Sequence, residues 1–100
     1  MVKVRGYRVE LGAIETVLYQ HDSIKELAVI VSRDEEGACA LHAFVVFSPG
    51  EKRSSIELKK HIGQRLPPYM IPSQISFLDE LPKTSGGKVD RRKLAEWTSR

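Results

Sequence analysis

Residues 24–48, IKELAVIVSRDEEGACALHAFVVFS, contain two segments that decide the fold. The first, residues 24–33, is rich in β-branched side chains and almost continuously apolar, which is typical of a strand covered on both faces. The second, residues 40–48, has the same character, and the polar RDEEG stretch between them indicates a turn. Because this link is short, we predict that the two strands pair as a hairpin.

The residues before these strands predict a short hairpin and a helix. Residues 2–11 alternate apolar and polar side chains around Gly6, which indicates a hairpin or a bent strand with its turn there. Residues 11–21 then place their apolar side chains on one helical face.

The residues after the strands predict two more helices and a third strand. Ser54 and Glu57 have capping-box spacing, so we expect a helix to begin there. The prolines within residues 66–72 must end that helix. Residues 73–81 predict a strand, and Asp90 is a suitable N-cap for a last short helix.

The predicted architecture is α+β, with a small three-stranded sheet packed against helices and a short N-terminal hairpin. The 100 residues are 41% hydrophobic and 29% charged, which is ordinary for one globular domain, residues 1–100. No apolar run reaches the ~20 residues that span a membrane, and the charged start is unlike a signal peptide. The single cysteine, Cys39, is interpreted as a small packed side chain, and we expect a cytoplasmic protein.

The net charge of +3 is unevenly distributed along the chain. Residues 81–100 contain six basic and two acidic side chains, so this segment carries +4 while residues 1–80 sum to −1. A local excess of this kind favours an anionic partner for the C-terminal segment. The segment contains a run of three basic residues, Arg91, Arg92 and Lys93. This run is either a solvated face or a docking surface for a partner.

The chemistry of the PKTSGGK stretch is left open by the local sequence. A phosphate-binding P-loop needs a glycine where Pro82 stands and a hydroxyl residue where Val89 stands, so that motif is excluded. In one reading Gly86 and Gly87 merely turn the chain, and Lys88 is solvated. In the other, the glycines let a hinged loop carry the lysine into an active site, where its ammonium can meet a carboxylate and a phosphate.

Three stretches resemble, in order, motifs of the adenylate-forming enzymes, which include acyl-CoA synthetases, luciferases and the adenylation domains of nonribosomal peptide synthetases. Residues 2–15, VKVRGYRVELGAIE, resemble the motif that opens their small C-terminal subdomain. Residues 66–72, LPPYMIP, resemble the motif in its middle, and residues 81–94, LPKTSGGKVDRRKL, resemble its final motif. The first two are closer to the peptide-synthetase branch, so the chain resembles the C-terminal subdomain of an amino-acid adenylation domain.

The resemblance implies a two-step reaction in which this mobile subdomain rotates between the steps. In the first step ATP and the carboxylate of an amino acid form an acyl-adenylate. Lys88 is then the catalytic residue that reaches the carboxylate and the α-phosphate, and Gly86 and Gly87 form the loop hinge. ATP and Mg²⁺ are bound mainly by a large N-terminal subdomain, which is absent from this chain and also determines which amino acid is activated.

In the second step, the resemblance implies transfer of the acyl group to the phosphopantetheine thiol of a peptidyl carrier protein. Arg5, Gly6 and Tyr7 then line the approach of the thiol, because a narrow channel needs close contact with the backbone at a glycine. The expected partners are therefore the large subdomain, the carrier protein and the amino-acid substrate, with no membrane. The isolated chain is expected to be inactive.

Two alternatives belong to other functional classes. One is a module that binds a carrier protein without catalysis, which the +4 segment permits. The other is a nucleic-acid-binding module, against which we note that the last twenty residues contain Trp97 as their sole aromatic side chain for base stacking. A metal site is not expected, since His21, His42 and His61 lack metal-ligand spacing.

Overall fold

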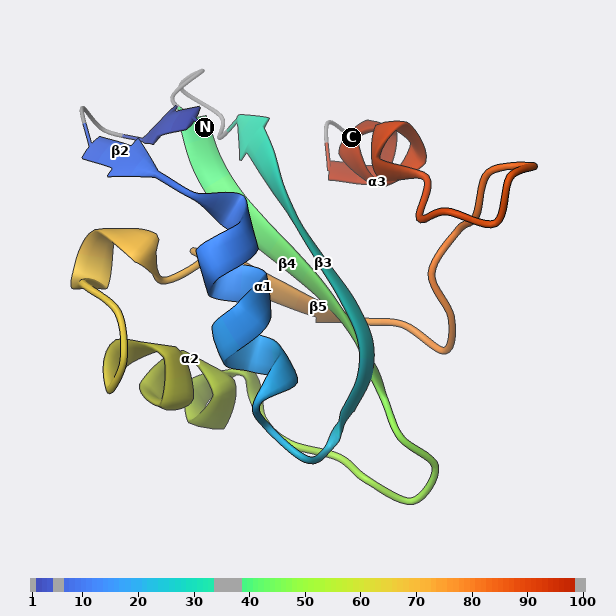
Figure 1. Ribbon diagram of the computed structural model, residues 1–100, viewed down its shortest axis with the longest axis horizontal. Helices are drawn as coiled ribbons and strands as arrows, with labels where there is room; N and C mark the ends of the chain where they lie inside the picture. Colours follow the sequence, from blue (N-terminus) through green and yellow to red (C-terminus); the bar gives the residue numbers. More distant parts are fainter. Residues whose placement is uncertain (1, 5–6, 34–38, 99–100) are drawn as a thin grey trace.

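The computed structural model describes residues 2–4, 7–33 and 39–98, and its elements confirm the predicted α+β class. Figure 1 shows α1 crossing in front of β4, with α2 beside it and α3 beyond β3. The elements are β1 (Val2–Val4), β2 (Tyr7–Val9), α1 (Leu11–Tyr19), β3 (Ile24–Arg33), β4 (Cys39–Phe47), α2 (Ser55–Gly63), the 3-10 helix η1 (Pro68–Met70), β5 (Gln74–Phe77) and α3 (Arg91–Thr98).

The main sheet has three strands in the order β3–β4–β5. β3 and β4 pair antiparallel, with Val29 opposite Ala43, and so form the predicted hairpin; its turn, residues 34–38, lies outside the described residues. β5 confirms the predicted third strand and runs parallel to β4, with Ala43 opposite Ile75. Parallel pairing requires a crossover, and α2 and η1 supply it. In this order β3 is an edge strand of the sheet.

The N-terminal hairpin is also confirmed. β1 and β2 pair antiparallel, with Val2 opposite Val9 and Val4 opposite Tyr7. Its predicted turn at Gly6 lies outside the described residues. Val9 is fully buried and joins the main core, so the end of this hairpin is tied to the body of the domain.

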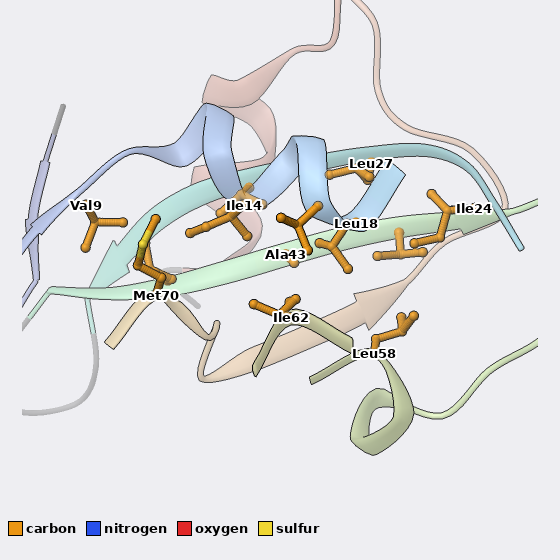
Figure 2. Packing of buried hydrophobic residues seen from close by; sticks show 13 residues of the cluster. Val9, Ile14, Leu18, Ile24, Leu27, Ala43, Leu58, Ile62 and Met70 are labelled. Carbon is orange, nitrogen blue, oxygen red and sulfur yellow. The ribbon is translucent and has the colours of Figure 1, made fainter. Parts of the chain in front are cut away.

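The sheet is covered on both faces, as the nearly continuous apolar content of β3 predicts. Alternate residues of β3 and β4 face α1 and α2, and Figure 2 shows side chains of these helices converging around Ala43 on β4. We call this the α1–α2 cluster. Its buried members are Val9, Ile14, Val17, Leu18, Ile24, Leu27, Val29, Leu41, Ala43, Val45, Leu58, Ile62 and Met70.

The opposite face of the sheet carries a smaller cluster, which we call the α3 cluster. Leu94 of α3 and Leu81 from the preceding loop cover it, and both side chains are almost fully buried. Its buried members are Ala28, Ile30, Phe44, Val46, Leu81 and Leu94. The chain between β5 and α3 therefore packs on the sheet face that α1 and α2 leave open.

Two of the helices begin at the predicted N-cap residues. Ser54 Oγ accepts a hydrogen bond from the Glu57 N–H at 3.1 Å, and Asp90 Oδ1 accepts one from the Lys93 N–H, also at 3.1 Å. The Glu57 carboxylate lies 3.1 Å from the Nε of Arg53, so it also forms an ion pair on the helix surface. Within the described part of the chain, every helix is too short or too polar to cross a membrane.

Candidate functional site

Lys88 is exposed and lies near the end of a closed turn, the Lys88 turn, which runs from Lys83 to Val89. The two end residues form an antiparallel bridge. Inside it the Thr84 N–H donates to the Lys88 carbonyl at 2.7 Å, and the Gly87 N–H donates to the Thr84 carbonyl at 3.0 Å. The stretch that the sequence leaves open as a turn or a hinged loop is therefore a hydrogen-bonded hairpin that presents the lysine to solvent.

The two glycines of this turn have different conformations. Gly87 has a φ of +85°, a left-handed conformation that side chains with a Cβ rarely adopt. Gly86 does not have a positive φ, and a Cβ added there would lie 3.8 Å from Thr84 Oγ1, an ordinary contact. The turn therefore requires a glycine at position 87, whereas position 86 has room for a small side chain.

The stems of the turn are fastened to the body by backbone bonding and packing. The Asp90 N–H donates to the Pro82 carbonyl at 2.8 Å, which joins the two stems just outside the turn. Leu81 is buried on one stem, and Val89 on the other packs against the same α3 cluster. The position of Lys88 is thus coupled to the α3 cluster through two short stems.

Ion pairs also tie both stems to residues far away in the sequence. Lys83 Nζ lies 2.6 Å from Glu26 Oε1, and Arg91 Nη2 lies 2.9 Å from Glu15 Oε2. Arg91 Nη1 also donates to the Val29 carbonyl at 2.9 Å. Arg91 is therefore bonded within its own domain while its side chain is 50% exposed, and the interpretation of the basic run as a solvated or docking face stays a prediction. Two cations of the +4 segment are already paired with acids of the body.

Nothing in the sequence pairs these residues, although Glu15, Lys83 and Arg91 lie in motifs. Glu15 is the last residue of the stretch 2–15, and Arg91 lies within the final motif. The first and final motifs thus meet in space at this ion pair, and η1 of the middle motif lies against β2 of the first. Their place within motifs is the one signal that the sequence offers.

The residues expected to line the thiol channel are only partly described. Arg5 and Gly6 lie outside the described residues, and Tyr7 begins β2 with its backbone opposite Val4. The assignment of these three residues to the second step therefore stays a prediction.

The three histidines lie apart from the Lys88 turn. His42 is buried on β4, where its Nε2 lies 2.7 Å from Ser76 Oγ and its Nδ1 has no hydrogen-bond partner. Burial lowers the pKa of His42 below the ordinary value of 6.5. The rings of His21 and His61 meet edge to face, with centroids 5.2 Å apart. The described residues contain no group of three or more His, Cys, Asp or Glu arranged to hold a metal ion.

Comparison with known families gives one match that covers most of the chain. The family model described as "AMP-binding enzyme C-terminal domain" matches residues 13–88. This match includes most of α1, the whole three-stranded sheet and Lys88.

Individual relatives agree with this match. Tyrocidine synthase 3 of Brevibacillus parabrevis is 48% identical over 93% of this chain, and surfactin synthase subunit 1 of Bacillus subtilis is 44% identical over 93%. The chain spans only 1% and 3% of the lengths of these two synthases. Among solved structures, an anthranilate CoA ligase in complex with anthranoyl-AMP is 33% identical, with a TM-score of 0.87; the match covers 98% of this chain and 20% of the ligase.

Proposed function

The chain belongs to the AMP-binding enzyme C-terminal domain family, and we propose that it is the mobile lid subdomain of an amino-acid-activating adenylation enzyme. The observation that carries this proposal is the exposed Lys88, held on a closed turn with both stems fastened to the body. The similarity to peptide synthetases supports an amino acid as the carboxylate substrate.

In the first step, the ammonium of Lys88 lies between the substrate carboxylate and the α-phosphate of ATP. Two anions that repel each other must approach, and a positioned cation holds them in reacting geometry. Negative charge then builds on the phosphorus oxygens as the carboxylate oxygen attacks and pyrophosphate leaves. A compact ammonium is suited to this place because it can contact both groups as a point charge.

We assign the binding of Mg²⁺ and of most of ATP to a large subdomain, and the phosphopantetheine thiol to a carrier protein. The described residues offer no cluster that fits Mg²⁺, so we assign the Mg²⁺ and most ATP contacts to a large subdomain, and no step here passes through the metal. After the adenylate forms, rotation of the lid brings Arg5, Gly6 and Tyr7 toward the active site. The phosphopantetheine thiol of a carrier protein then passes along them and forms a thioester with the acyl group, while AMP and the thiol proton leave.

The test is amino-acid-dependent exchange of pyrophosphate into ATP by this chain joined to a large adenylation subdomain. We expect Lys88→Ala to lower the exchange rate by about 10²–10³-fold, as for loss of one preorganised charge-stabilising donor. Lys25→Ala is the matched control, since Lys25 is an exposed lysine on β3. Full exchange by Lys88→Ala would show that the role of Lys88 is wrong.

The isolated chain provides a second test of the lid assignment. We expect no exchange from it with any amino acid, because the ATP and amino-acid pockets are assigned to the large subdomain. Robust exchange by the isolated chain would contradict the proposal directly.

A further inference from the structure

We propose that Glu15 and Arg91 are positioning residues that set the location of Lys88 by clamping its turn to the free edge of β3. This inference rests on the proposed catalytic role of Lys88. It assigns a task to two motif residues that the proposed function leaves without one.

The clamp combines an ion pair with hydrogen bonds to the backbone of β3. Glu15 Oε2 accepts hydrogen bonds from the Val29 N–H and from Arg91 Nη2, both at 2.9 Å. Arg91 Nη1 donates to the Val29 carbonyl, also at 2.9 Å. β3 is an edge strand, and the N–H and carbonyl groups of Val29 point away from its neighbour β4. The side chains of Glu15 and Arg91 bind these two groups, as the backbone of a neighbouring strand would.

The clamp joins three elements that are distant in sequence. Glu15 lies on α1, Val29 on β3 and Arg91 at the start of α3. The Glu15 carboxylate makes its hydrogen bonds charge-assisted. Its side chain is 19% exposed, whereas that of Arg91 is 50% exposed. An edge strand of this kind is a fixed reference point, because its central residues are buried in the core.

Fixing Arg91 fixes Lys88 because little chain separates them. Only Val89 and Asp90 lie between, and the Asp90 N–H is bound to the Pro82 carbonyl at 2.8 Å. The second ion pair, between Lys83 and Glu26, holds the other stem through a single contact between two side chains. The Glu15–Arg91 pair is exposed to a similar degree, but both of its side chains also hydrogen-bond the Val29 backbone, so we assign the main positioning role to this clamp.

The test uses the chain joined to a large adenylation subdomain. Glu15→Gln keeps an oxygen that can accept from the Val29 N–H but removes the charge that attracts Arg91. We expect the kcat of pyrophosphate exchange to fall by about 10–100-fold, since a displacement of about 1 Å can cost that much. KM for ATP and for the amino acid should change little. Arg91→Gln should give the same pattern. It replaces Glu15→Gln as the test variant if Glu15→Gln folds poorly.

Matched controls remove the same charges elsewhere. Glu10→Gln removes a carboxylate from an exposed residue just before α1, and Lys25→Gln removes a cation from an exposed residue on β3. Both should retain full kcat. Equal losses in the controls would show that net charge, and not the clamp, sets the rate.

The decisive comparison places Glu15→Gln in a Lys88→Ala background. If Glu15 acts only through Lys88, the second substitution costs nothing further once the lysine is gone. A full additional loss in the double variant would overturn the positioning role while leaving the role of Lys88 intact. Unchanged kcat in both Glu15→Gln and Arg91→Gln, with Lys88→Ala still impaired, would also overturn it.

Hydrogen exchange separates failure of the clamp from failure of the proposed function. In the isolated chain, Glu15→Gln should speed exchange of the Thr84, Gly87 and Asp90 amides by about tenfold or more, while the centre of β4 keeps its protection. If Lys88→Ala retains full pyrophosphate exchange, the proposed function fails, and the clamp then has no role in catalysis. Unchanged exchange at these amides would show that the ion pair does not hold the turn at all.

Discussion

The two faces of the sheet differ in what holds their covering segments in place. The α1–α2 cluster contains thirteen buried side chains from two helices, three strands and η1, so that face is held by apolar packing. The α3 cluster has six, and the segment that covers it is also held by the ion pairs of Lys83 and Arg91. The Lys88 turn, which we propose is catalytic, is thus attached on the second face by fewer apolar contacts and more directional polar ones.

This difference suits the two parts to different tasks. Apolar packing on the first face stabilises the fold but gives no fine control of a single atom, because the contacts are non-directional. Ion pairs and hydrogen bonds on the second face contribute less stability but fix orientation. The predictions below test whether the two faces are indeed separable in stability and in function.

The largest expected effect comes from truncating one leucine on each face. Leu18 and Leu94 are both fully buried, on α1 and α3 respectively. We expect Leu18→Ala to lower the free energy of unfolding by about 3–4 kcal/mol, since the dense α1–α2 cluster cannot close the cavity. Leu94→Ala should cost only about 2 kcal/mol, because α3 can shift toward the smaller cavity or detach locally. Urea unfolding of the 100-residue chain measures both values.

Amide hydrogen exchange distinguishes local from global loosening in these variants. Leu94→Ala should expose the amides of α3 while those of β4 remain protected, whereas Leu18→Ala should weaken protection in both. Ile56→Ala is the control, since Ile56 is 67% exposed and its loss should change stability by less than about 0.5 kcal/mol. Identical losses of protection everywhere in both leucine variants would mean that the two faces unfold as one unit.

The next effect concerns the glycines of the Lys88 turn. Gly87→Ala forces a Cβ into a left-handed conformation and should cost about 1–2 kcal/mol of stability, with slower pyrophosphate exchange in the joined enzyme. Gly86→Ala is the matched control and should be close to neutral in stability, because its added Cβ meets only an ordinary contact. If Gly86→Ala instead lost pyrophosphate exchange at unchanged stability, that result would support a hinge that needs both glycines.

Much of the fold could be predicted from the sequence because local patterns repeat within each element. The apolar content of β3, the alternation around Gly6 and the N-caps at Ser54 and Asp90 are all set by nearby residues. The parallel direction of β5 and the 3-10 helix of η1 could not be predicted in this way. They depend on how the chain crosses between distant strands, and no residue pattern in the sequence records that path.

The candidate site also has a part that the sequence predicts and a part that only the fold shows. Lys88 was predictable as a candidate because the whole motif is contiguous in sequence. The closed form of its turn was not, since that depends on Thr84 bonding across to Lys88 and on the left-handed conformation of Gly87. The partners Glu15 and Arg91 are 76 residues apart, and a surface acid and a basic run each have many ordinary explanations. Only the fold shows that they meet at one residue of an edge strand.

The smallest effect is a pH dependence that arises on the face of the α3 cluster. His42 follows the alternation of Phe44 along β4, and its ring stacks on that phenylalanine with centroids 4.2 Å apart. Burial lowers the pKa of His42, so the folded state resists a proton that the unfolded chain accepts near its ordinary value of 6.5. The contribution to stability is therefore complete above that pH and is lost as the pH falls below it.

We expect urea unfolding to show a lower free energy at about pH 5.5 than at about pH 7.5, with a slope of at most about 1.4 kcal/mol per pH unit for one proton. His42→Gln keeps a side chain that can hydrogen-bond Ser76 but removes the titration. Its stability should fall less on acidification, and the difference isolates His42 because His21 and His61 are present in both proteins. Equal losses in the two proteins would mean that protonation of His42 is not coupled to unfolding. Protonated His42 would then be no less stable on the face of the α3 cluster than in the unfolded chain.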